Sequence, residues 1–261
     1  MKLHTRFLLL CCLFMTQSIS ATEVEGLFTA DVTARSQSLA DRNGALNEAL
    51  QLVFSRFFIT NDFVQNPVLK AALGNAASYV GQYQYLQLAG DTATQPADIM
   101  RVTFNKNSLT ALMRTSGLAL WGAKREKTLL WLAIEQGTKE AFLDIAQDTE
   151  IAEALQHAES SNGIPLLFPL MDLEEKQAIS VMDILSTKPD KALAASERYG
   201  VKAVLSGKLV KRRTCWRSEW ALHVNNMDER WATPCGKLKA NLTSALQTVY
   251  QYLSVFYAQK P

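Results

Sequence analysis

Three acidic residues, Asp172, Glu174 and Glu175, form the densest cluster of side chains in the sequence that could bind a ligand or a cation. They follow an apolar run, residues 164–170, whose length is typical of a buried strand. Ligands of open α/β sheets bind beyond the carboxyl ends of the strands, so Asp172 could anchor a cation or a polar ligand. The alternative is a solvated loop that caps the next helix. We therefore treat these three residues as the candidate ligand loop.

The other residue types that catalyse reactions do not form a recognisable site. Beyond residue 21 the histidines are His157 and His223, neither with neighbours at metal-ligand spacing. The sequence has no Gly-x-Ser-x-Gly elbow, Walker loop or Gly-x-Gly-x-x-Gly motif. Gly207, a lone glycine in an apolar run, is more typical of close packing than of ligand contact. We predict no catalytic residue, no cofactor and no bound metal, which favours a non-enzymatic role.

A second candidate surface lies in residues 215–234, whose pattern predicts an antiparallel hairpin that turns near Asn225 and Asn226. The hairpin is rich in tryptophan and arginine, the residue types enriched in interface hot spots. If one of its strands is a sheet edge, a partner could add a strand to it. The alternative is a hairpin with one face packed on the sheet. The candidate interaction surface consists of Trp216, Arg217, Trp220, Arg230 and Trp231.

The elements that must position these residues form an α/β region over residues 126–261. Apolar runs at 128–134, 164–170 and 204–209 predict buried strands, and amphipathic segments at 149–158 and 190–199 predict helices between them. The hairpin and an amphipathic helix at 238–257 complete the region. Strands that alternate with helices predict a mixed, mostly parallel sheet covered on both faces, a three-layer arrangement.

A different pattern precedes this region. Residues 22–120 predict strand, helix, strand, strand and helix, with apolar stripes at three- and four-residue steps in the helices. Antiparallel strands packed on helices make an α+β layer. The predicted fold class is therefore α/β, with an α+β amino-terminal layer before the three-layer region. Residues 121–125 are the break between the two.

The first 21 residues have the three parts of a secretory signal peptide. Lys2 and Arg6 precede an apolar run, and Ser18, Ser20 and Ala21 supply small residues at cleavage spacing. The run is shorter than the about 20 apolar residues that span a bilayer, so membrane attachment would require an uncleaved signal. The chain has 27 Lys and Arg against 25 Asp and Glu, and the leader holds two of the basic residues. The mature chain is therefore near neutral, which excludes a nucleic-acid partner.

Cysteine usage agrees with export. Cys11 and Cys12 lie in the leader, so the mature chain holds Cys215 and Cys235. An exported protein with two cysteines favours one disulfide, and a turn near Asn225 would place the two opposite each other at the open end of the hairpin. The alternative is two separate thiols.

Several segments together resemble a bacterial family, domain of unknown function 2066. The resemblance rests on WGAKREKTLLWLAIE, GIPLLFPLMDLEE, ASERYGVKAVLSGKL, the early helix ALNEALQLVFSRF, and the pair Trp216 and Trp220. The family implies an exported cell-envelope protein without an assigned activity. A looser likeness joins the second region to the TolB amino-terminal domain, the curli secretion lipoprotein and penicillin-binding-protein activators. That likeness implies a domain that binds other envelope proteins.

We therefore expect an exported, periplasmic protein of a Gram-negative type envelope, acting as an accessory or protein-binding module with an envelope protein as its partner. The alternative is a periplasmic small-ligand binder or an enzyme that uses the acidic loop at Asp172.

Overall fold

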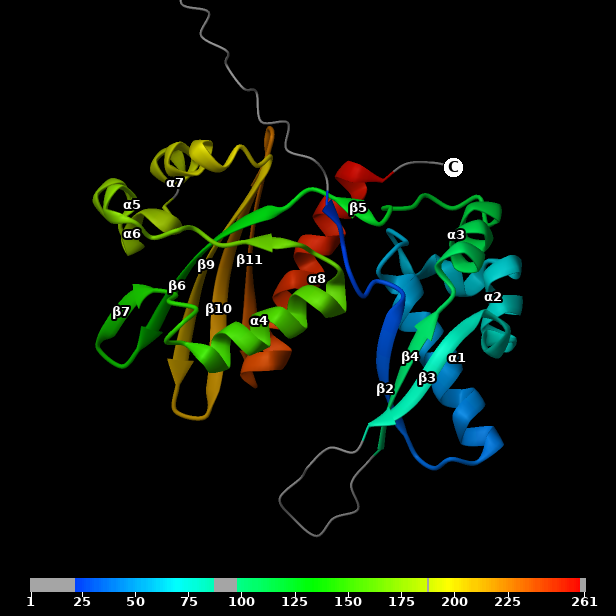
Figure 1. Cartoon of the computed structure of the whole chain (residues 1–261). Helices are drawn as coiled ribbons and strands as arrows, with labels where there is room; N and C mark the ends of the chain where they lie inside the picture. Colours follow the sequence, from blue (N-terminus) through cyan, green and yellow to red (C-terminus); the bar gives the residue numbers. More distant parts are fainter. Residues whose placement is uncertain (1–21, 87–97, 187, 259–261) are drawn as a thin grey trace, which may run out of the picture.

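The computed structural model describes residues 22–86, 98–186 and 188–258, and these residues form the predicted α/β fold (Figure 1). The signal peptide predicted over residues 1–21 lies outside them. Two sheets dominate, one of three strands and one of six, and each has its own helices. Among the described residues, no helix is both long and apolar enough to cross a bilayer.

The first sheet is antiparallel and is packed on helices, as the pattern of residues 22–120 predicts. Its spatial order is β2 (Thr29–Ala34), β4 (Asp98–Phe104) and β3 (Val80–Leu86). Its helices are α1 (Leu39–Ser55), α2 (Pro67–Gly74) and α3 (Lys106–Thr115). The Asn66 side chain accepts hydrogen bonds from the backbone N–H groups of Val68 and Leu69, so it caps α2 ahead of Pro67. Apolar side chains from one face of the sheet and from all three helices share one core.

The second sheet is mixed, with the spatial order β11, β10, β9, β6, β7, and β8 beside the beginning of β6. Strand β6 runs parallel to β9 and β8, whereas the other pairs are antiparallel. Parallel pairing is thus confined to three of the six strands. The strands are β6 (Thr128–Gln136), β7 (Lys139–Phe142), β8 (Leu166–Leu167), β9 (Ala203–Arg212), β10 (Cys215–Val224) and β11 (Met227–Gly236).

Helices cover both faces of this sheet, as predicted. Helices α4 (Thr149–Asn162) and α8 (Leu238–Tyr257) pack side by side on one face (Figure 1). The short helices α5 (Leu173–Ala178), α6 (Val181–Ile184) and α7 (Asp190–Ser196) lie on the other. Side chains of β6 alternate between these two cores, since Leu130 and Leu132 face α4 whereas Leu129 and Trp131 face α6 and α7.

Strand β8 is much shorter than the apolar run that predicts it. Only Leu166 and Leu167 form a strand, because Pro165 and Pro169 lack the N–H groups that a longer ladder requires. Strands β8 and β9 are parallel, as expected, but β6 lies between them. Strand β7, which follows the tight turn at Gly137, carries no apolar run and is not predicted by the sequence.

Two buried arginines join the two sheets and their helices. Arg125 lies in β5 (Lys124–Arg125), which pairs with β1 (Thr22–Glu23). Its guanidinium donates to the carbonyl oxygens of Gly163 at 2.6 Å, Gly122 at 2.9 Å and Trp121 at 3.1 Å, and to that of Arg56. The side chain is fully buried. Residues of the first layer and of α4's end thus converge on one cation.

Arg56, which directly follows α1, makes the complementary set of bonds. It donates to Ser161 O in α4 at 3.1 Å and to Thr29 O at 2.6 Å. Neither arginine forms an ion pair with a carboxylate among the described residues. Burial lowers the pKa of each guanidinium to about 10, so both remain charged at neutral pH. We call Arg56, Arg125 and their carbonyl acceptors the arginine clasp.

The prediction that Gly207 allows close packing is confirmed, because a Cβ added at this position would overlap the ring of Trp220. Changing Gly207 to Ala should lower the free energy of unfolding by about 1–3 kcal/mol, the usual cost of overpacking. The matched control is Gly44→Ala within α1, where a Cβ meets no atom within 4 Å. That change should raise stability by about 0.5–1 kcal/mol, because Ala favours a helix interior. Urea unfolding of both variants tests this, and equal effects would contradict it.

The arginine clasp leads to a second prediction. Arg125→Met keeps the bulk but removes the donor from four carbonyl oxygens, three of them in buried hydrogen bonds, so we expect a loss of about 3 kcal/mol or more in unfolding free energy. The control, Arg101→Met, removes a half-exposed ion pair with Asp31 at 2.7 Å and should cost about 1 kcal/mol or less. Chemical denaturation measures both. Similar losses in the two variants would show that the clasp is not a special support of the fold.

Candidate functional site

The acidic loop caps a helix. Asp172 precedes α5, and its Oδ1 accepts a hydrogen bond from the backbone N–H of Glu175 at 2.9 Å. Its Oδ2 accepts a hydrogen bond from Arg198 Nη1 at 2.9 Å. The Glu175 N–H, and then Arg198, hold the pKa of Asp172 below its ordinary value. Glu174 is exposed and lies 3.8 Å from the same arginine nitrogen.

Glu175, the third acid of the loop, is buried and bonded on both oxygens. Its Oε2 accepts a hydrogen bond from Met171 N at 2.6 Å, and its Oε1 accepts from the Tyr199 hydroxyl and from Arg198 at 3.4 Å. Burial and the bond to Glu175 raise the pKa of Tyr199 to about 12. The carboxylates that sequence analysis assigned to a ligand thus have partners inside the chain, which favours the capping alternative.

The position of the loop also differs from the expectation. The sequence places it at the carboxyl end of a strand, where ligands bind in open α/β sheets. Because β8 is short and pairs with Thr128 and Leu129, it ends near the amino end of β6. The carboxyl ends of β6 and β9, at Gln136 and Arg212, lie at the opposite end of these strands.

The residues of the predicted hairpin surface lie on two different faces. Trp216 and Trp220 are 6% and 1% exposed and belong to the core beneath α8, so the prediction that they lie on an interaction surface is wrong. Alternation along β10 is the reason, since it turns every second side chain toward the helix. Trp231, opposite Trp220 in the register, is partly buried and stacks on it at 6.5 Å.

The two arginines of that surface lie on the opposite face of the hairpin. Arg217 is exposed and its Nη2 lies 3.6 Å from Glu219 Oε1. Arg230 donates to Leu185 O at 3.0 Å and to Ser186 O, so it fastens the segment between α6 and α7. Tryptophan and arginine therefore do not form one patch.

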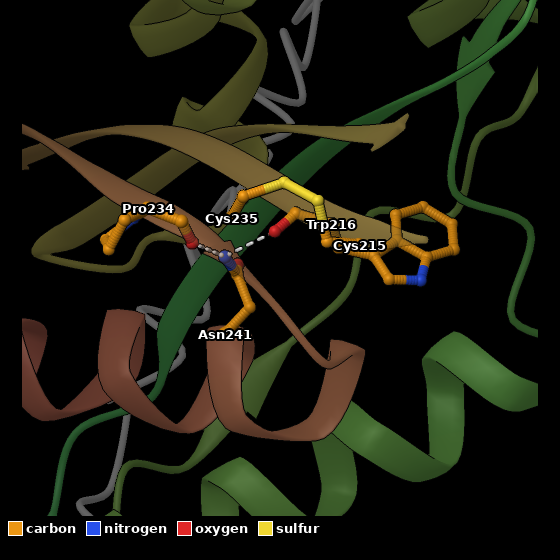
Figure 2. Close-up of a disulfide and its surroundings, with 5 residues drawn as sticks. All are labelled: Cys215, Trp216, Pro234, Cys235 and Asn241. Atoms are coloured by element: carbon orange, nitrogen blue, oxygen red, sulfur yellow. Dashed lines mark hydrogen bonds between the residues drawn. A yellow bond between two sulfur atoms is a disulfide. The ribbon is translucent and has the colours of Figure 1, made fainter. Parts of the chain in front are cut away.

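The predicted disulfide between Cys215 and Cys235 is present (Figure 2). Their Cα atoms lie 5.4 Å apart, at the open end of the hairpin. Beneath it, Asn241 of α8 donates to the carbonyl oxygens of Trp216 at 3.0 Å and Pro234 at 2.9 Å, one from each strand (Figure 2). Its Oδ1 accepts a hydrogen bond from Ser218. The sequence did not indicate this role of Asn241. No local pattern shows which backbone groups a polar residue on an apolar helical stripe will bind.

A serine, a histidine and an aspartate also lie near one another on the face of the sheet opposite α8. His223 Nδ1 lies 2.5 Å from Asp228 Oδ1. Ser206 pairs with Ala221 in the register, so it is a diagonal neighbour of His223. Within the described residues, Ser206 Oγ and His223 Nε2 are buried without a hydrogen-bond partner, and no bond joins them. The contact between nucleophile and base that acyl transfer requires is therefore not formed. The other predicted histidine, His157, lies on the exposed side of α4, 3.3 Å from Ser161 Oγ.

A hollow lies along the open side of β6, and we call it the edge groove. Strand β8 pairs with residues 128–129 and β7 with residues 133–136, and Leu132 O accepts a hydrogen bond from Leu143 N at 2.8 Å, so residues 130 and 131 have no strand partner on this side. The groove has a volume of about 1010 Å³. Its apolar lining includes Leu130, Leu132, Ile145, Phe168, Leu170 and Val181.

A second hollow, the junction pocket, lies where the first layer meets the end of α8. It has a volume of about 600 Å³ and four aromatic walls, Phe28, Phe57, Trp121 and Tyr257. Lys106, Arg114 and Lys124 lie around it. Sequence reasoning missed both hollows because each is lined by segments far apart in the chain. The one local feature of the sequence that indicates the edge groove is the pair Pro165 and Pro169, which shortens β8 and leaves part of β6 without a neighbouring strand.

No group of three His, Cys, Asp or Glu side chains that could hold a metal ion occurs within residues 22–86, 98–186 and 188–258.

Comparison with known families shows that residues 21–122 match a domain of unknown function (DUF8605). This is an uncharacterised domain, as expected, but it is not domain of unknown function 2066, so that resemblance is corrected. No curated protein and no solved structure matches the chain, so the likeness to TolB-type domains has no support. Apolar strands and amphipathic helices are general requirements of an α/β fold, which is why segments of this kind suggest a family that the chain does not match.

The disulfide leads to a third prediction. Changing both Cys215 and Cys235 to Ser should lower the free energy of unfolding by about 3 kcal/mol, because the bond closes a loop with a sequence separation of 20. Denaturation with and without a reducing agent measures this. The reductant should destabilise the wild type and leave the double variant unchanged. A wild type insensitive to complete reduction would contradict the prediction.

Proposed function

We propose that this protein is an exported binding module of the bacterial cell envelope, with an accessory rather than an enzymatic role. It docks an apolar segment of a partner envelope protein in the edge groove. The observation that carries the proposal is this groove, an open, mostly apolar hollow on a sheet edge where strand pairing is interrupted.

Exposure of the apolar side chains around the groove supports docking. Leu170 is 70% exposed and Ile145 is 43% exposed, and both line the groove. A contiguous exposed apolar patch on a soluble surface commonly marks an interaction site. Met182, next to the lining residue Val181, is 85% exposed. A partner that covers these side chains would remove apolar surface from water, which is the main driving force of association.

The charges of the groove indicate what the partner segment carries. Lys139 and Lys176 line it, and neither forms an ion pair within the described part of the chain. Asp144 and Asp148 also line the groove and keep their charge, although Asp144 Oδ1 accepts from Ala146 N at 3.0 Å and Asp148 Oδ2 accepts from Asp144 N at 3.0 Å. An apolar segment that places acidic residues beside Lys139 and Lys176 is complementary to these two lysines.

The periplasmic location rests on two features of the chain. The first 21 residues have the pattern of a cleavable signal peptide. The disulfide between Cys215 and Cys235 suits an oxidising compartment. The alternative role, a small-ligand binder or enzyme at Asp172, is not favoured, because the acids of that loop bond to Arg198, Tyr199 and backbone N–H groups.

The proposal predicts where a partner touches the protein. A photo-crosslinking amino acid at Leu170 should capture a discrete envelope protein in living cells, whereas the same residue at Leu39, 64% exposed on α1, should not. Lys176→Glu should weaken the capture at position 170, because it opposes the acidic flanks of the partner. Mass spectrometry of the crosslinked product from the periplasmic fraction identifies the partner and the mature N-terminus.

Two outcomes would contradict this role. The proposed docking site is wrong if positions 170 and 39 give the same products, or if position 170 gives none in a protein that folds and accumulates normally. Recovery of the protein only from the cytoplasm, with residues 1–21 intact, would refute export.

A further inference from the structure

The junction pocket has features of a small-molecule site that are independent of the edge groove. Its volume of about 600 Å³ lies within the range of about 300–1,000 Å³ that is common for ligand pockets. Its walls come from both layers, since Phe28 and Phe57 belong to the first layer and Tyr257 ends α8. Sites between structural units are frequent places for ligands.

The aromatic walls pack on one another in two pairs. The ring centroids of Phe28 and Phe57 lie 5.1 Å apart. Trp121 and Tyr257 are stacked, with centroids 5.7 Å apart and an angle of 15° between the rings. Aromatic rings prefer offset-stacked or edge-to-face neighbours at such distances. Phe57 and Trp121 are each 3% exposed, so the partly exposed rings of Phe28 and Tyr257 are the aromatic surface left for a flat ligand to contact.

The charges around the pocket favour an anion. Its two acids are already engaged, because Glu23 pairs with Lys106, and Glu126 binds Lys202 at 2.7 Å and the Tyr257 hydroxyl at 3.3 Å. Lys124 lies opposite Glu23 in the β1–β5 register but forms no ion pair among the described residues, and Arg114 forms none either. These two side chains are left to bind a negative group.

The arginine clasp adds to this positive potential. The guanidinium of Arg125 lies 4.2 Å from the ring centroid of Trp121, and this ring is itself a wall of the pocket. Carbonyl oxygens satisfy the hydrogen bonds of Arg125 without cancelling its charge. A buried charge is screened less than an exposed one, so its field extends into the pocket.

We propose that the junction pocket binds an anion with a flat aromatic body. The aromatic body packs against Phe28 and Tyr257, the two partly exposed aromatic walls, and the anionic group binds Arg114 and Lys124. A ligand in this position contacts both layers and stabilises the contact between them.

Two fluorescent probes with the same ring system test the proposal on the whole folded protein. The probes are 8-anilinonaphthalene-1-sulfonate and the uncharged N-phenyl-1-naphthylamine. The sulfonate should bind saturably, and the double variant Arg114→Gln and Lys124→Gln should weaken it at least about tenfold, the effect of losing one charged hydrogen bond. The uncharged probe should change less than about twofold, since no charge contributes to its binding. Circular dichroism confirms that the variant is folded.

Two further variants assign the effect to this pocket. Lys139→Gln with Lys176→Gln removes the same number of charges from the edge groove and should leave sulfonate binding unchanged. Thr110→Trp fills the junction pocket from its α3 wall and should weaken both probes. If the double variant of Arg114 and Lys124 folds poorly, the single variant Arg114→Gln allows the same comparison of the two probes.

Three results would overturn the proposal. Unchanged sulfonate binding in the Arg114 and Lys124 variant would show that these residues bind no anion. A loss that follows the groove lysines would place the probe in the edge groove. Equal losses for both probes in the Arg114 and Lys124 variant would show a change in apolar surface and no anion recognition.

Discussion

Two buried guanidiniums that bond only to backbone carbonyl oxygens join the two layers of this protein. A charge in the interior is tolerated when its hydrogen bonds are satisfied, and Arg125 donates to four carbonyl groups. These acceptors lie at chain positions 56, 121, 122 and 163, so the clasp holds the end of α1, the link between the layers and the end of α4 in fixed positions. Gly163 fits this arrangement because a Cβ there would lie 2.6 Å from Arg125 Nη1.

Strand β6 has a comparable joining role within the α/β region of residues 126–261. It lies between β9 and the short strands β7 and β8, and its side chains contribute to the cores on both faces of the sheet. Parallel pairing with β9 is continuous, whereas on the opposite side of β6 residues 130 and 131 have no strand partner. The edge groove results directly from this interrupted pairing. An edge that most proteins cover or protect with charge is here lined by apolar side chains.

The hairpin shows how packing decides which surface is available. Its tryptophans have the composition of an interaction hot spot, but Trp216 and Trp220 anchor α8, and the disulfide and Asn241 hold the open end of the hairpin against that helix. The acidic loop illustrates the same constraint. Asp172 caps the start of α5, and Glu175 accepts a hydrogen bond from Tyr199. Arg198 forms an ion pair with Asp172.

The sequence by itself determined the order and type of the long elements, because their apolar periodicity and their capping residues are local properties. It placed α8 at residues 238–257 and the disulfide at the open end of the hairpin. Tertiary structure alone decided which strand lies beside which, which side of β6 stays open and where buried charges find acceptors. Those outcomes depend on contacts between residues far apart in the chain, such as Arg125 with Gly163, and no local pattern encodes them.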